Sequence, residues 1–142
     1  MACYNIETKC QPATDNILHP APEKFADLIM EVITNKGISN RVIIQSFDFR
    51  TLKILHQKYP AVKTAALIES NDKRSLEDQV KELGFTPSIY SPAFSLVSKD
   101  LVNDCHERNI KVIPWTVNDK KNMEKLLDMG VDGIISDYPD LF

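Results

Sequence analysis

The sequence predicts an α/β fold in which strands and helices alternate along one domain. Three observations lead to this prediction: the chain has 142 residues, the size of one domain; short apolar runs alternate with helical patterns; and several of those runs show no polar alternation. Strands of that kind are typical of parallel sheets that are buried on both faces. Repeated βα units build either a doubly wound sheet or a (β/α)8 barrel, and the pattern alone favours neither.

Six segments have the composition of β-strands. Two of them are apolar at the centre, at residues 42–44 and 65–68, where valine, isoleucine, leucine and alanine predominate. The predicted strands are 4–8, 41–47, 63–69, 88–90, 111–117 and 133–136. A complete eight-unit barrel usually takes ~250 residues, so six strands in 142 residues would form an incomplete barrel.

Five segments between these strands predict helices. The first opens at Pro22, because proline suits the first turn, and ends near Gly37, because glycine readily adopts a left-handed conformation. Its apolar residues recur at helical spacing and form one face: Phe25, Leu28, Ile29, Val32 and Ile33. The remaining predicted helices are 48–59, 75–83, 99–108 and 120–129.

Composition argues against several classes of function. The chain has 17 basic and 20 acidic residues and a net charge of −3, whereas non-specific nucleic-acid binding needs a basic surface. No apolar run approaches the ~20 residues of a membrane span, so none is predicted. Cys3, Cys10 and Cys105 form no C-x-x-C pair, and we expect them to pack as small apolar residues rather than to bind a metal. The compartment stays open.

Ligands bind beyond the carboxyl ends of the strands in both candidate architectures. Glu7 and Lys9 stand at the end of the first predicted strand, two residues apart, so their side chains share one face. A carboxylate and an ammonium group that converge on one pocket suit a metal ion and an anion such as phosphate. Spacing alone also fits, and favours, an ordinary surface ion pair.

Other residues near strand ends carry weaker signals. Trp115, the only tryptophan, lies in the fifth predicted strand and could wall a pocket, although its position alone favours packing in the core. Ser46 lacks the G-x-S-x-G context of a nucleophile, and Asp48 is better explained as a helix N-cap.

The three histidines matter because phosphodiester hydrolysis usually needs a proton donor for the leaving alkoxide. His56 and His106 fall inside predicted helices, away from the strand ends, so we expect structural roles for them. His19 lies in the loop after the first strand and is a minor candidate for the site.

Four segments together resemble the glycerophosphodiester phosphodiesterase family. Residues 5–9, N-I-E-T-K, resemble the family's N-I-E-x-K strand, and residues 44–48, I-Q-S-F-D, resemble its next strand and helix start. Residues 114–118, P-W-T-V-N, resemble its W-T-V-N strand. Residues 130–139 resemble its closing G-V-D-G-I-x-T-D-x-P element, with Ser136 in place of the usual threonine. The motifs keep the family's order and span almost the whole chain.

This resemblance implies a TIM barrel that uses a divalent cation, commonly calcium or magnesium, to hydrolyse glycerophosphodiesters to glycerol 3-phosphate and an alcohol. Three carboxylates hold the cation in the family, and the one in the N-I-E-x-K motif matches Glu7. The lysine of that motif matches Lys9 and implies a position facing the phosphate. The tryptophan of the W-T-V-N motif matches Trp115 and implies a place in the wall of the substrate pocket.

The sequence departs from the family pattern at its beginning. The family opens with an H-R-G strand, a strand bearing an E-x-D pair and an H-D turn, which supply two catalytic histidines, an arginine and the other two metal carboxylates. Residues 1–142 contain none of these motifs, so we expect a single partial barrel domain that lacks the first two barrel strands. We accordingly expect no catalytic residue, no useful metal affinity and no activity from this chain alone.

Two other hypotheses remain open. The chain could be a non-catalytic, barrel-derived binding or interaction module, which a genuine start codon at Met1 would favour over an upstream reading frame encoding H-R-G. A doubly wound sheet outside the family would need a phosphate-binding loop after a strand, and the sequence has none. A partial barrel also has two unpaired parallel edges, which predict either a homo-oligomer or a covering segment.

Overall fold

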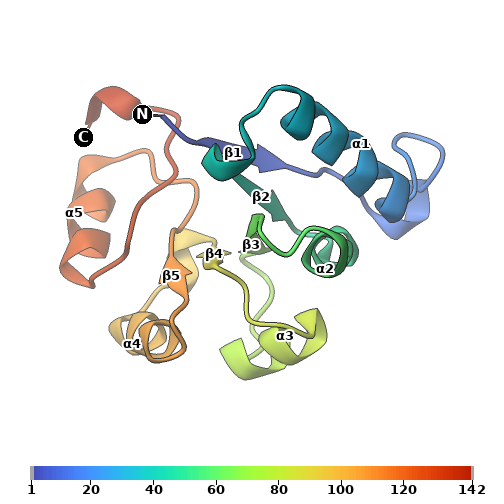
Figure 1. Ribbon diagram of the computed structural model, residues 1–142. Coiled ribbons are helices and arrows are strands. Elements are labelled where there is room, and N and C mark those ends of the chain that lie inside the picture. Colours follow the sequence, from blue (N-terminus) through green and yellow to red (C-terminus); the bar gives the residue numbers. More distant parts are fainter. Residues whose placement is uncertain (1, 142) are drawn as a thin grey trace.

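The computed structural model describes residues 2–141 and contains one parallel sheet with helices along one face. The strands are β1 (Tyr4–Glu7), β2 (Val42–Ser46), β3 (Lys63–Ile68), β4 (Ile89–Pro92) and β5 (Lys111–Val112). Their order in the sheet is β1-β2-β3-β4-β5, so each strand pairs with its neighbours in sequence. Figure 1 shows the helices spaced around the outside of an arc of strands. This arrangement is part of a (β/α)8 barrel, because a doubly wound sheet would reverse its strand order and carry helices on both faces.

Five α-helices connect the strands, as predicted. They are α1 (Pro22–Asn35), α2 (Phe49–Lys58), α3 (Leu76–Leu83), α4 (Lys99–Glu107) and α5 (Lys120–Asp128). Side chains of four residues cap the last four helices by accepting a backbone N–H: Asp48, Ser75, Ser98 and Asp119. Gly84 closes α3 in the left-handed conformation, with φ 79°. None of the helices in the described part of the chain is long and apolar enough to cross a bilayer.

The end of the sheet differs from the predicted strands 111–117 and 133–136. The fifth strand is regular only to Val112, because Pro114 has no N–H to donate to the ladder. Beyond it, the Trp115 N–H still donates to the Pro92 carbonyl at 3.0 Å. The segment 133–136 is extended, and its Ile135 N–H donates to the Pro114 carbonyl at 2.9 Å, but it forms no regular strand. The sheet therefore has five regular strands and an extended sixth segment.

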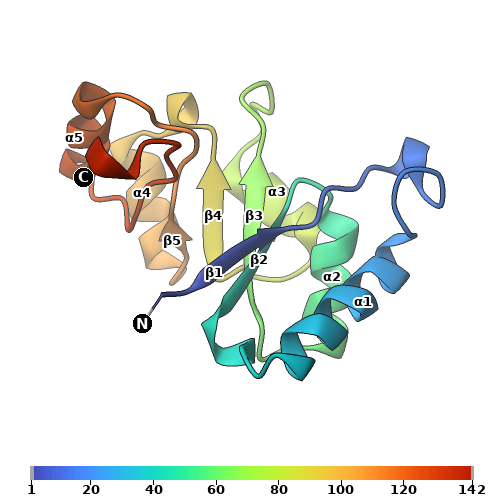
Figure 2. The ribbon, with the colours of Figure 1, turned by 90° about the horizontal axis from the view of Figure 1, so that it is seen from above.

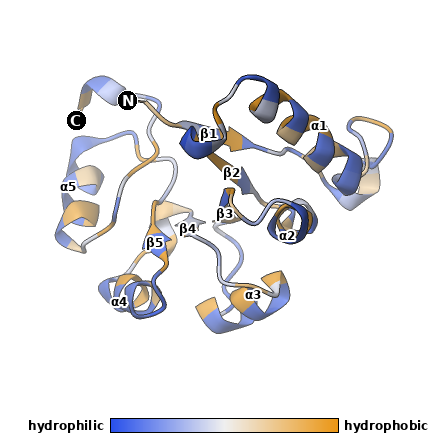
Figure 3. Ribbon diagram, viewed as in Figure 1, coloured by the Kyte–Doolittle hydropathy of each residue, from blue (hydrophilic) through white to orange (hydrophobic). Residues whose placement is uncertain are grey.

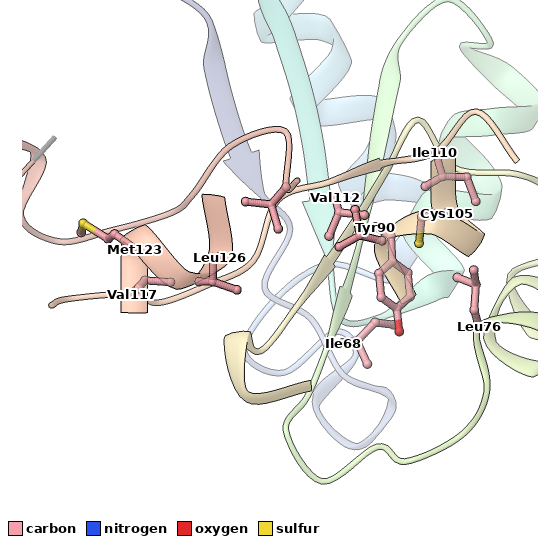
Figure 4. Packing of buried hydrophobic residues seen from close by; sticks show 11 residues of the cluster. Ile68, Leu76, Tyr90, Cys105, Ile110, Val112, Val117, Met123 and Leu126 are labelled. Carbon is pink, nitrogen blue, oxygen red and sulfur yellow. The ribbon is translucent and has the colours of Figure 1, made fainter. Parts of the chain in front are cut away.

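The apolar core lies between the sheet and the helices, and the helices turn their apolar faces inward (Figure 3). One cluster joins α1 and α2 to the first strands: Ala26, Met30, Ile33, Val42, Ile44, Leu52, Leu55, Val62, Ala66 and Leu83. A second cluster extends from Tyr90, Ile68 and Leu76 to Met123 and Leu126 on α5 (Figure 4). Phe49 packs against both clusters, so the two form one continuous core.

The cysteines only partly follow the expectation of packing residues. Cys105 is fully buried in the second cluster, and burial raises the pKa of its thiol to about 12. Cys10 is half-buried, with its thiol 3.6 Å from an Asp48 oxygen, and Cys3 is exposed. The expectation was therefore wrong for Cys3, which precedes the first strand and is exposed instead of packed in the core.

The opposite face of the sheet carries alternate strand residues and has no helix layer among the described residues. Parallel pairing sets Asn5 beside Ile43 and Glu7 beside Gln45. The Asn5 amide donates to the Gln45 side-chain oxygen at 2.8 Å, so the two residues point to the same face. In a barrel this face is the interior, and its carboxyl end is the mouth.

Candidate functional site

A cleft of ≈ 850 Å³ opens at the carboxyl ends of β1, β2 and β3; the β3 arrow points upward to this end in Figure 2. Its walls are the loop after β1, the start of α2 and the loop between β3 and α3. The lining side chains include Glu7, Lys9, Phe47, Arg50, Lys53 and Arg74. This is the end of the sheet where barrel enzymes bind their substrates.

The structure brings Glu7 and Lys9 together in this cleft. The Lys9 Nζ lies 3.7 Å from the Glu7 Oε2, and the Lys9 side chain is 82% exposed against 24% for Glu7. An exposed contact of that length holds the two groups only weakly, so both heads stay available to a ligand. The two side chains share one face at the end of β1, and the ion pair that spacing alone favoured is present; their roles as site residues stay a prediction.

Trp115 lies at the same end of the sheet and on the same face as Glu7 and Lys9. It does not line the cleft but contacts Phe47, which does. Its indole N–H donates to the Ser91 carbonyl at 2.9 Å, and the side chain is half-buried. Its ring meets Phe47 edge-on, with centroids 5.3 Å apart and planes at 87°. Phe47 lines the cleft itself, so Trp115 supports the wall that Phe47 presents. Sequence reasoning passed over Phe47 as a site residue, although it stands in the I-Q-S-F-D motif.

Arg50 joins two loops at the cleft through its guanidinium group. It donates to both oxygens of Asp15, at 2.7 and 3.0 Å, and to both oxygens of Asp48, at 2.6 to 3.0 Å. Asp48 also accepts the Arg50 backbone N–H at 3.0 Å, which confirms it as the N-cap of α2. We call this group the Arg50 clamp. It fixes the loop after β1 to the first turn of α2.

The Arg50 clamp sets the charge of its members. Hydrogen bonds from Arg50 lower the pKa of Asp15 below its usual value. Burial alone would raise the pKa of Asp48, but the side-chain and backbone hydrogen bonds from Arg50 outweigh burial and lower it. Both carboxylates are thus ionised at neutral pH and are committed to the guanidinium group.

Arg74 forms a second clamp in the loop between β3 and α3. It donates to Asp72 at 2.7 Å and to Glu82 at 2.5 Å. Hydrogen bonding from Arg74 lowers the pKa of Asp72 to about 2. This Arg74 clamp is more exposed than the Arg50 clamp and ties together residues that are close in sequence.

His19 also lines the cleft, but both of its ring nitrogens are engaged within its own loop. Nε2 accepts the Gln11 backbone N–H at 3.1 Å, and Nδ1 lies 2.9 Å from the Pro20 carbonyl. A backbone N–H can only donate and a carbonyl can only accept, so these partners assign the proton to Nδ1. His19 therefore organises the loop, and its Nε2 also lies 2.9 Å from the Thr14 hydroxyl.

The other two histidines lie away from the cleft, in helices as predicted. His56 on α2 stacks on Phe85, with centroids 4.0 Å apart and planes at 3°. His106 on α4 contacts Asp132 at 2.9 Å, and the same carboxylate accepts the Val112 N–H. Both contacts hold elements of the scaffold together.

The residues of this chain do not by themselves fit a hard divalent cation. Calcium takes six to eight oxygen ligands. Of the carboxylates around the cleft, Asp48, Asp72 and Glu82 belong to the arginine clamps, Glu7 has only its weak contact with Lys9, and Glu69 is exposed at the end of β3. Within residues 2–141, no three His, Cys, Asp or Glu side chains are grouped so that they could hold a metal ion. Glu7 can offer one ligand to a cation that other carboxylates complete.

Comparison with known proteins agrees with this architecture. Residues 4–141 match the Glycerophosphoryl diester phosphodiesterase family. A glycerophosphodiester phosphodiesterase from Bacillus subtilis (strain 168) is 34% identical over 145 residues, which cover 99% of this chain and 48% of that protein. The chain spans about half the length of the curated relatives it matches.

Two solved structures share the fold. A crystal structure from Silicibacter pomeroyi DSS-3, assigned to the glycerophosphoryl diester phosphodiesterases, has a TM-score of 0.80 at 26% identity and covers 95% of this chain and 46% of that chain. A glycerophosphodiester phosphodiesterase from Parabacteroides distasonis ATCC 8503 has a TM-score of 0.74 at 24% identity, over 96% of this chain and 52% of that chain. From the match over nearly its whole length, this chain belongs to the glycerophosphoryl diester phosphodiesterase family.

Proposed function

We propose that this chain forms one wall of the active site of a metal-dependent phosphodiesterase that converts a glycerophosphodiester to glycerol 3-phosphate and an alcohol. One observation carries the proposal: the Glu7 carboxylate and the Lys9 ammonium group meet at the mouth of the sheet, beside the Phe47 ring that Trp115 supports. A carboxylate suits a metal ion, an ammonium group suits a phosphate, and an apolar wall suits the carbon atoms of glycerol.

Each of these residues has a distinct role in the proposal. Glu7 supplies one oxygen ligand to a divalent cation, calcium or magnesium. Lys9 is a flexible point charge at the exposed rim and pairs with the phosphate of the diester. Phe47 and Trp115 form a wall against which the carbon atoms of the glycerol pack. The remaining carboxylates and the proton donor would come from residues other than these 142.

The proposal therefore includes inactivity of the chain by itself. Glu7 and Glu69 are the carboxylates of the cleft outside the arginine clamps, which makes a poor site for a cation that seeks six or more oxygens, and His19 has both nitrogens engaged. We expect calorimetric titration with calcium or magnesium to show no binding, and glycerophosphocholine to remain intact with the purified chain. Micromolar calcium affinity, or turnover by the chain alone, would contradict this part of the proposal.

Complementation tests the activity directly. We would place the N-terminal half of the 34%-identical Bacillus subtilis relative ahead of this chain and measure release of glycerol 3-phosphate. The fusion should be active, and Glu7→Gln should lower kcat/KM at least ~100-fold because the cation loses a ligand. Glu31→Gln, which removes an exposed carboxylate on α1, is the matched control and should change nothing. Equal activity of the Glu7→Gln and control fusions would exclude the assigned role.

A second candidate function is a non-catalytic binding or interaction module, and one feature favours it. Within residues 2–141, β1 pairs only with β2, and the inner face of the sheet has no covering layer. Unpaired parallel edges are templates for association with another chain. We expect light scattering on the purified chain to report a dimer or larger assembly. A clean monomer at high concentration would count against this function.

A further inference from the structure

The loop between β1 and α1 ends in an apolar tip. Ile17 is 76% exposed and Leu18 is 78% exposed, and these neighbours are the two most exposed large hydrophobic side chains in the described part of the chain. Pro12 and Ala13, on the same loop, are exposed as well. Figure 3 shows the hydrophobic stretch on this loop, beyond the amino-terminal end of α1. Surface turns normally carry polar side chains, so the tip needs an explanation.

The loop holds this apolar tip away from the body of the protein. Asn16 adopts a positive φ of 60°, its N–H donates to the His19 carbonyl at 2.7 Å, and its side chain accepts the Ala21 N–H at 3.1 Å. The Arg50 clamp anchors Asp15, immediately before the turn. These bonds keep Ile17 and Leu18 from folding back into the core.

The loop carries little charge. Between residues 10 and 22, Asp15 is the only Asp, Glu, Lys or Arg, and it is paired with Arg50, which also binds Asp48. Moving an unpaired charge toward an apolar phase is costly, so the pairing of Asp15 with Arg50 lowers the cost of bringing the tip toward hydrocarbon. A protein partner would need about 800 Å² of matching surface on each side, which two adjacent side chains on a convex tip do not provide.

We propose that this tip docks the protein on a phospholipid surface, with Ile17 and Leu18 inserted at the boundary between head groups and acyl chains. Aliphatic side chains drive such interfacial binding in proportion to the apolar area they bury. Leu18 also lines the cleft, so docking brings the mouth of the sheet to the lipid surface. The chain has a net charge of −3, so the attraction is apolar and not electrostatic.

Co-sedimentation with phosphatidylcholine vesicles tests the proposal. The chain should bind reversibly, and Ile17→Ser or Leu18→Ser should each lower the partition coefficient about tenfold or more, as expected for loss of one buried aliphatic side chain. Val32→Ser on α1 and Leu127→Ser on α5 are matched controls, because they remove aliphatic groups that are 58% and 54% exposed elsewhere. The controls should partition like the unmodified chain.

The arginine clamps offer an independent comparison. Arg50→Gln leaves the Asp15 charge unpaired beside the tip and should weaken vesicle binding, whereas Arg74→Gln breaks the other clamp and should not. Adding phosphatidylglycerol to the vesicles should give no increase in binding. Ile17 is the cleaner single site, since it does not line the cleft, and circular dichroism would show that each variant keeps its fold.

Several outcomes would overturn the proposal. These are absence of vesicle binding, equal losses in the tip and control variants, or binding that grows with anionic lipid. Conversion of a dimer to a monomer by Ile17→Ser would instead identify the tip as a contact between copies of this chain. If the serine variants lose their fold, vesicle binding by Ile17→Thr, Arg50→Gln and Arg74→Gln tests the proposal in their place. The vesicle assay involves no turnover, so its failure would leave the proposed phosphodiesterase function untouched.

Discussion

The mouth of the sheet is built differently over its first three strands and over its last two. Over β1, β2 and β3, two arginine clamps shape an open cleft, and the connection after β2 is only Phe47 and Asp48. Over β4 and β5, the backbone continues as hydrogen-bonded extended segments, and Asn118 and Asp137 bind each other across them at 2.9 and 3.0 Å. Trp115 is pinned there by its bond to Ser91.

The difference shows that the two parts of the mouth offer different kinds of group to a ligand. The first region presents the weakly paired Glu7 and Lys9 in a cleft that the arginine clamps hold open, while the second supplies a fixed apolar wall. Both regions lie over one continuous core, because Phe49 packs against both apolar clusters. We therefore expect the two regions to unfold together although they carry different side chains at the mouth.

The largest expected effect tests that shared core. Leu52→Ala under the first region and Leu126→Ala under the second should each cost about 2–5 kcal/mol of unfolding free energy, because each removes a buried side chain and leaves a cavity. Leu127→Ala, at an exposed position on α5, should cost less than about 0.5 kcal/mol. Urea unfolding should remain a single transition in all three variants. Two separate transitions would break the comparison by showing two independent cores.

The two clamps should differ in strength. Arg50→Gln should cost about 1.5–3 kcal/mol, because it leaves the nearly buried Asp48 carboxylate without its charged partner and releases the loop after β1. Arg74→Gln removes a more exposed pair and should cost about 0.2–1 kcal/mol. Chemical denaturation of both variants measures this difference, and equal losses would contradict the ranking.

Acid should weaken the first region within a defined range. Asp15, Asp48 and Asp72 have pKa values that are lower in the folded protein than in the unfolded chain. Their contribution is therefore fully present above about pH 4 and is lost as the pH falls toward the folded value, about 2 for Asp72. Unfolding measured between pH 5 and pH 2 should show this decline. Arg50→Gln should flatten the decline by removing the share of the Arg50 clamp, Asp15 and Asp48.

A further effect concerns the apolar wall. Trp115→Phe keeps an aromatic ring but removes the hydrogen bond to the Ser91 carbonyl, which should cost about 0.5–1.5 kcal/mol. Tyr138→Phe, at an exposed position near the same end of the chain, should cost nothing measurable. Thermal melting of the two variants compares them, and an unchanged melting temperature for Trp115→Phe would show that the wall does not depend on this bond.

Much of the fold follows from local pattern. Apolar runs and helix caps such as Asp48 placed the strands and helices. The strand-end rule named Glu7, Lys9 and Trp115 as candidates, whose roles stay predictions. The prediction of a regular strand at 133–136 was wrong, because Pro114 interrupts the hydrogen-bond ladder between that segment and the segment after β5. Pro114 is visible in the sequence, and a proline within a strand-like run argues against a regular central strand.

The parts of the site that escaped sequence reasoning depend on distant contacts. Arg50 is 35 residues from Asp15, and no local pattern indicates that they meet. The edge-on contact between Phe47 and Trp115 likewise joins strands that are far apart in the sequence. The role of His19 depends on its hydrogen-bond partners, since a loop position near the mouth fits a catalytic or a structural imidazole equally well.

The position of Trp115 has a practical consequence. It is the only indole in the chain, and it touches Phe47 at the rim of the cleft. Its intrinsic fluorescence, excited beyond the tyrosine absorption band, therefore reports on one place in the molecule. A ligand that displaces the Phe47 ring changes the polarity around the indole and shifts its emission, which gives an optical readout of the mouth without any added label.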